Sequence, residues 1–159
     1  MAGRTRWLVE TALLAALITV TGIFKIPGLV PGTEFQLSAP LAVAICVVFG
    51  FTKYITAGMI SSLVGLILGT QNLFNVAIAL IFRLSVGIIL AVFGHSKPVI
   101  ILAGPVGSFI ARLAVGGLLG KAAIPLVIAA LPGMLYTALT VLPLVMLFKR
   151  VKSQTEKVL

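Results

Sequence analysis

The sequence predicts an all-α integral membrane protein, built as a compact bundle of about six transmembrane helices with both termini in the cytoplasm. Of its 159 residues, 60% are hydrophobic and only 9% are charged. A soluble domain of this size cannot hide so much apolar surface from water. Because one crossing takes about 20 mostly apolar residues, the length leaves room for roughly six helices and for no separate soluble domain.

Long apolar runs, separated by turn-forming or charged residues, locate the individual helices. They place the spans near residues 7–24, 36–52, 54–70, 74–93, 98–118 and 124–148 of a single transmembrane domain, residues 1–159. The second and third spans are short and are separated only near Thr52 and Lys53, so a single bent hairpin is the alternative. The first run is too long for a signal peptide, and we expect it to remain as a helix.

The basic residues predict the orientation. The net charge is +9, from 12 Lys and Arg against 3 acids. We interpret this excess as membrane topology and contact with anionic lipid, without a nucleic-acid partner. One side would hold Arg4, Arg6, Lys53, Lys97, Lys149, Arg150, Lys152 and Lys157, and the other only Lys25 and Lys121. The side richer in basic residues is expected to be cytoplasmic. The first, third and fifth loops would then face outward, and the first, near residues 25–34, would be either a lid or a rigid connector.

Two arginines lie inside predicted spans. Arg83 shares a helix face with Asn75, Ala79 and Gly87, because residues four apart lie on one side of a helix. The face of Arg112 holds Gly104, Ser108 and Gly116. A charge within a span costs at least a few kcal/mol and normally faces the interior of the bundle. We therefore expect both arginines to face one outward-opening pocket, roughly 10 to 15 Å below the outer boundary.

The acids are too few to neutralise both arginines. Glu10 and Glu156 belong to the cytoplasmic side, which leaves only Glu34 on the outer side. A remaining arginine would bind backbone carbonyls, water, or the carboxylate or phosphate of a ligand, and we favour the ligand. The alternative is a structural role in holding helices together. The residues predicted to bind substrate are Arg83, Arg112, Asn75, Asn72, Gln71, Glu34, Ser108, Tyr136 and Thr137.

Several kinds of chemistry are absent from the sequence. The segment from Gly116 to Ala122 lacks the spacing and the Ser or Thr of a phosphate-binding loop, so we expect no ATP hydrolysis by this chain. No catalytic constellation is present, and we expect no enzyme activity. The lone Cys46 and the lone His95 cannot form a metal cluster, and no cofactor is expected; Cys46 would be a buried, inert thiol. Active uptake would therefore need a partner.

The combination of these features resembles the substrate-binding S component of an energy-coupling factor (ECF) transporter. The resemblance covers the whole chain: small size, about six helices, a long first outer loop, and small residues at Ala12 and Ala16 in the first span. It implies that Ala12 and Ala16 contact a transmembrane coupling subunit, that two ATPase subunits drive uptake, and that the outer pocket binds a vitamin or related micronutrient. Membership would also imply a prokaryotic plasma membrane.

The arginines disfavour a cationic cargo, and an aromatic content of 8% disfavours an aromatic-rich thiamine site. A carboxylate- or phosphate-bearing micronutrient is expected instead, of the biotin, pantothenate, niacin, lipoate or folate class. The alternative function is a self-sufficient small anion carrier or channel that works as an oligomer. A membrane enzyme is disfavoured, because the sequence has no carboxylate cluster for lipid chemistry.

Overall fold

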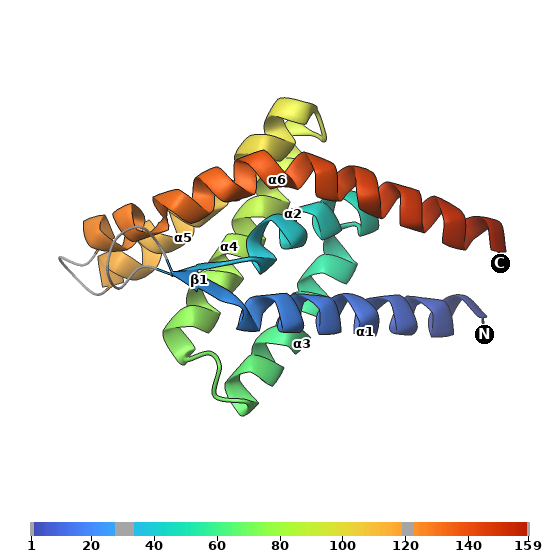
Figure 1. Cartoon of the computed structure of the whole chain (residues 1–159), viewed down its shortest axis with the longest axis horizontal. Helices are drawn as coiled ribbons and strands as arrows, with labels where there is room; N and C mark the ends of the chain where they lie inside the picture. Colours follow the sequence, from blue (N-terminus) through green and yellow to red (C-terminus); the bar gives the residue numbers. More distant parts are fainter. Residues whose placement is uncertain (1, 28–33, 119–122, 159) are drawn as a thin grey trace.

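A computed structural model of the chain describes residues 2–27, 34–118 and 123–158 (Figure 1). For residues 2, 25–27, 34–36, 123, 157 and 158 it describes the backbone only. Within these residues the elements are α1 (Ala2–Ile23), β1 (Lys25–Pro27), β2 (Glu34–Gln36), α2 (Ser38–Phe49), α3 (Phe51–Ile67), α4 (Leu73–Phe93), α5 (Lys97–Leu118) and α6 (Ala123–Val158).

The chain is a membrane-embedded helical protein. Four of the described helices, α1, α4, α5 and α6, are long and apolar enough to cross a bilayer. α2 has 12 residues and extends about 18 Å, less than the roughly 30 Å of hydrocarbon in a bilayer. The number of complete crossings and the side on which the termini lie stay predictions. Figure 1 shows both termini at the same end of the molecule, as the predicted orientation requires.

The break between the second and third spans lies earlier than predicted. α2 ends and α3 begins at Gly50, whose φ of 86° is strained for a residue with a side chain. The prediction placed the break at Thr52 and Lys53, but both lie inside α3. A hydrophilic pair can belong to a helix, whereas a left-handed backbone angle ends one.

The connection between α1 and α2 contains an element that the all-α prediction did not include. β1 and β2 pair antiparallel, with Lys25 opposite Gln36 and Pro27 opposite Glu34. β2 contacts α6 and α1. The hairpin lies at the end of α1 opposite the termini (Figure 1). Residues 28–33 between the strands lie outside the described residues, so the choice between a lid and a connector stays open.

The helices pack around an apolar core. α4 packs against α5, α5 against α6, α1 against α3, and α2 against α6. The most buried side chains of this core include Val43, Ile45, Tyr54, Val86 and Val141. The free thiol of Cys46 is buried among them, as predicted.

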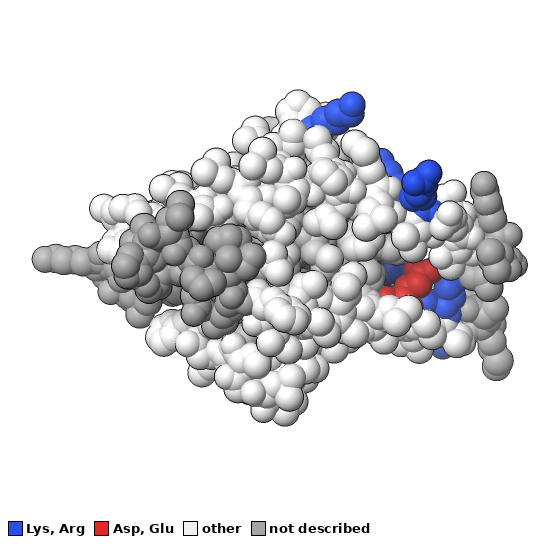
Figure 2. All heavy atoms as spheres, in the orientation of Figure 1, with Lys and Arg blue, Asp and Glu red and all other residues white. Residues whose placement is uncertain are grey.

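Charged side chains gather near the termini. Figure 2 shows lysines and arginines at this end of the visible face, together with acidic atoms. Glu10 of α1 accepts hydrogen bonds from Arg6, at 2.8 Å, and from Lys53 of α3. Lys152 of α6 donates to the backbone oxygen of Val48, at 3.1 Å, near the C-terminus of α2, where a helix favours a positive charge. These contacts tie α1 to α3 and α6 to α2.

Candidate functional site

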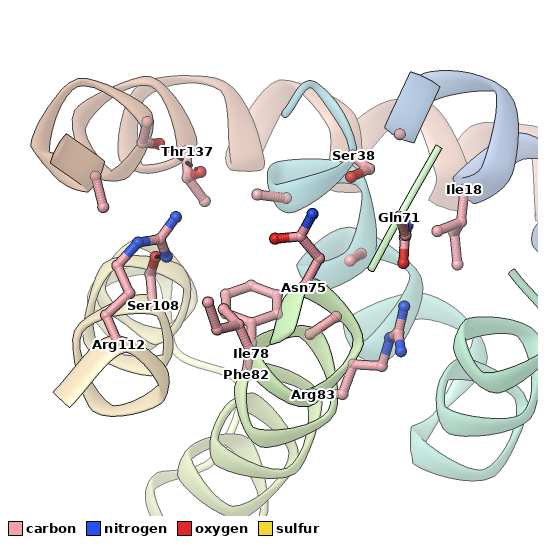
Figure 3. A pocket seen from close by; sticks show the side chains of 16 residues that line it. Ile18, Ser38, Gln71, Asn75, Ile78, Phe82, Arg83, Ser108, Arg112 and Thr137 are labelled. Carbon is pink, nitrogen blue, oxygen red and sulfur yellow. Dashed lines mark hydrogen bonds between the residues drawn. The ribbon is translucent and has the colours of Figure 1, made fainter. Parts of the chain in front are cut away.

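A cavity of about 200 Å³ lies between the helices and is lined by the buried Arg83 and the partly buried Arg112. The described side chains around it come from α1, α2, α4, α5 and α6, and from the turn before α4. The lining residues are Ile18, Gly22, Ser38, Ala39, Ala42, Gln71, Asn75, Ile78, Ala79, Phe82, Arg83, Ser108, Arg112, Ala130, Gly133 and Thr137. Figure 3 shows the side chains among them directed around a common space.

Arg83 is held deep in the protein at one side of this cavity. Its side chain is 5% exposed, and its Nη1 donates a hydrogen bond of 2.8 Å to Ser62 Oγ of α3. Gly58 lies one turn before Ser62 and leaves space for the side chain of Arg83, because a Cβ at position 58 would lie 2.8 Å from Arg83 Cζ. Thus α3 supplies both the space and one partner for the guanidinium group.

Arg112 lies at the other side of the cavity and is supported within its own helix. Its Nη1 donates a hydrogen bond of 2.6 Å to Ser108 Oγ, four residues earlier on α5. Thr137 lies nearby on α6 (Figure 3) and uses its hydroxyl to donate to the backbone oxygen of Gly133. The i to i+4 spacing of Ser108 and Arg112 therefore predicted a contact that the structure contains.

No carboxylate lines the cavity among the described side chains. Glu10 is engaged by Arg6 and Lys53, and neither Arg83 nor Arg112 forms an ion pair within the described part of the chain. A guanidinium group has five N–H donors, so a single serine satisfies only part of each arginine. The cavity therefore combines positive charge with spare hydrogen-bond donors, which is the chemistry that binds carboxylates and phosphates.

Two amide side chains lie on the same cavity. Asn75 stands between the arginines in Figure 3, and Gln71 lies near Arg83. The buried Oε1 of Gln71 has no hydrogen-bond partner in the described part of the chain. Buried polar atoms are usually satisfied, so an N–H or O–H donor of a ligand would complete the hydrogen bonding at this oxygen.

The structure brings together six of the nine predicted substrate-binding residues: Arg83, Arg112, Asn75, Gln71, Ser108 and Thr137. Asn72 is exposed and instead caps α4, accepting a hydrogen bond of 2.8 Å from the backbone N–H of Asn75. Tyr136 is half-buried and is not among the lining residues. Glu34 belongs to β2, and its side chain lies outside the described residues. Their role with a substrate stays a prediction.

The sequence analysis missed the apolar part of the cavity and the support behind Arg83. Ile78 and Phe82 lie on α4 beside the predicted face, and Ser38 belongs to the start of α2. Ser62 of α3, which accepts the hydrogen bond from Arg83, was not among the predicted residues. A serine one helical turn from a glycine, on a span neighbouring a buried arginine, is the signal that could have identified it.

Ser62 and Ser61 provide a matched test of the support for Arg83. Both are buried on α3, but Ser61 Oγ has no partner among the described residues, whereas Ser62 Oγ accepts from Arg83. We expect Ser62→Ala to lower the stability by about 1 to 3 kcal/mol, because it leaves a buried donor unpaired. Ser61→Ala should be neutral or slightly stabilising. Thermal unfolding in detergent measures both, and equal losses in the two variants would contradict this role of Ser62.

The described residues contain no group of three or more His, Cys, Asp or Glu side chains that could hold a metal ion. The chemistry of the cavity is therefore that of cations, amides and hydroxyls. It can bind and orient an acidic molecule.

Comparison with known proteins identifies a relative. Over 137 residues, the chain is 52% identical to Protein BioX of Lysinibacillus sphaericus, and the match covers 86% of this chain and 82% of that protein. No family model and no solved structure matches the chain.

Proposed function

The chain belongs to the same family as Protein BioX, and from this membership and the cavity we propose that it is the substrate-binding S component of an ECF-type importer in a bacterial cell membrane. It captures a vitamin or related micronutrient that carries a carboxylate or phosphate. The observation that carries this proposal is the cavity in which Arg83 and Arg112 have no carboxylate partner among the described side chains. The name of this relative suggests a biotin-related cargo.

The size of the cavity favours a small cargo. Its volume of about 200 Å³ lies below the roughly 300 to 1,000 Å³ that is usual for small-molecule sites. Large members of the predicted cargo classes, such as folates, are therefore less suitable than short acids. The cationic side chains favour the anionic form of the cargo.

The exposed side of α1 supports a partner contact. Ala12 and Ala16 are both exposed, whereas Thr11, Leu14, Ala15 and Ile18 face the core. Small exposed residues four apart allow another helix to approach closely. In the proposed importer these two alanines contact the transmembrane coupling subunit, and two ATPase subunits supply the energy.

Reconstitution in liposomes tests this function. The purified chain alone should show no net uptake of a labelled acidic micronutrient, and uptake should require the coupling subunit, both ATPase subunits and internal ATP. A variant of the ATPases that cannot hydrolyse ATP serves as the control. Uptake by the chain alone, without nucleotide, would contradict the proposal and support a self-sufficient anion carrier.

A further inference from the structure

The two arginines of the cavity occupy separate positions. In Figure 3, Arg83 and Arg112 lie at opposite sides of the pocket, and Asn75 lies between them. Arg83 is held by Ser62 of α3, and Arg112 by Ser108 of α5. Each guanidinium group thus has its own support on a different helix. The cavity therefore has two separate cationic positions. This arrangement differs from one in which both arginines bind the same acidic group.

The two positive charges of the cavity favour a cargo with two negative groups. Arg83 is buried and Arg112 is partly buried. A charge removed from water is costly unless an opposite charge lies close to it, and the described lining supplies no negative charge. A cargo with one acidic group neutralises one arginine and leaves the other without an ionic partner. A cargo with two acidic groups neutralises both and also relieves the repulsion between the cations.

Part of the cavity lining is apolar, beside the polar side chains of Asn75, Gln71, Ser38, Ser108 and Thr137. Along α4, Ile78, Ala79 and Phe82 line the cavity beside Arg83, and α2 adds Ala39 and Ala42. These side chains can pack against methylene groups but cannot satisfy a polar one. The middle of the cargo should therefore be a hydrocarbon chain, with any polar group near the amides of Asn75 and Gln71.

We infer that the cavity selects a small molecule with an acidic group at each end and an apolar chain between them. Arg83 binds one acid, and Arg112 binds the other. This inference rests on the proposed function, because it specifies the chemical class of the captured cargo. The distance between the two arginines then determines which length of the cargo's hydrocarbon chain binds best.

Calorimetric titration of the purified protein with straight-chain dicarboxylic acids of increasing length tests the inference. One length should bind best, and it should bind at least about tenfold more tightly than the monocarboxylic acid of the same length. The monomethyl ester of the best diacid keeps the length and removes one charge, so it should lose the same factor. This comparison uses only the unaltered protein and does not depend on the folding of a variant.

Variants then assign the two ends. Arg83→Gln and Arg112→Gln should each reduce the ratio of the diacid's affinity to that of the monoacid to less than about twofold. Lys97 is an exposed lysine outside the cavity, and Lys97→Gln should retain the ratio of the parent protein. Binding of the ester or the monoacid as tightly as the diacid, or of no diacid at all, would overturn the inference. If the monoacid still depends on the arginines in that case, the proposed anion-binding function survives. If none of these acids depends on them, that function fails as well.

Discussion

Replacement of Arg83 or Arg112 by glutamine is expected to weaken binding of the acidic cargo by about 2 to 5 kcal/mol, or roughly thirty-fold to several-thousand-fold. Both guanidinium groups line the cavity, and each keeps donors that its serine partner does not use. Loss of either one leaves an acidic group of the cargo in a poorly hydrated site without its charge partner. Titration calorimetry of the purified variants measures the effect.

Two controls separate this role from a structural one. Lys97→Gln removes an exposed positive charge outside the cavity and should not change the affinity. Arg→Lys at positions 83 and 112 retains the charge but loses the planar pair of donors, so its affinity should fall between that of the parent and the glutamine variant. Unchanged affinity in both glutamine variants would make the arginines structural residues.

Introduction of a bulky side chain at Ala12 or Ala16 is expected to abolish uptake and to leave cargo binding intact. Both residues are exposed on α1 and lie outside the cavity lining. A leucine at either position would prevent the close approach of a partner helix, which small residues permit. Uptake in liposomes that contain the complete importer, together with calorimetric titration of the isolated chain, measures the two effects separately.

An exposed alanine on another helix provides the matched control. Ala114 lies on α5, and Ala114→Leu adds the same bulk on a surface that the proposal leaves to lipid. It should retain uptake. Equal loss of binding and uptake in the Ala12 and Ala16 variants would contradict the coupling role, and so would normal uptake in both.

Hydrophobicity predicted the long helices well, because about 20 apolar residues form a strong signal. The predicted spans 74–93 and 98–118 differ from α4 and α5 by one residue at their starts. Other boundaries depend on backbone geometry or on polar helical turns. The break at Gly50 follows from its φ of 86°, and α6 continues to Val158 through a charged tail that a hydropathy pattern does not include. The strands β1 and β2 have only three residues each, too few for a periodic pattern.

The spacing along single helices predicted part of the cavity. Asn75, Ala79 and Arg83 share one face of α4, and Ser108 and Arg112 share one face of α5, as expected for residues four apart. Contributions from other helices depend on tertiary packing, which periodicity does not contain. Ile18 of α1 and Ala42 of α2 belong to this group. Gly87 was predicted on the face of Arg83, but it makes room for the ring of Phe51, outside the cavity.

Mass spectrometry of the small molecule that copurifies with the protein tests whether this cavity binds an anion. The parent protein should release an acidic molecule with a carboxylate or phosphate group, and the Arg83→Gln/Arg112→Gln double variant should release none. The Lys97→Gln variant should release the same molecule as the parent. A neutral or cationic molecule, or an acid that the double variant retains in the same amount, would contradict the assignment of this cavity as an anion-binding site.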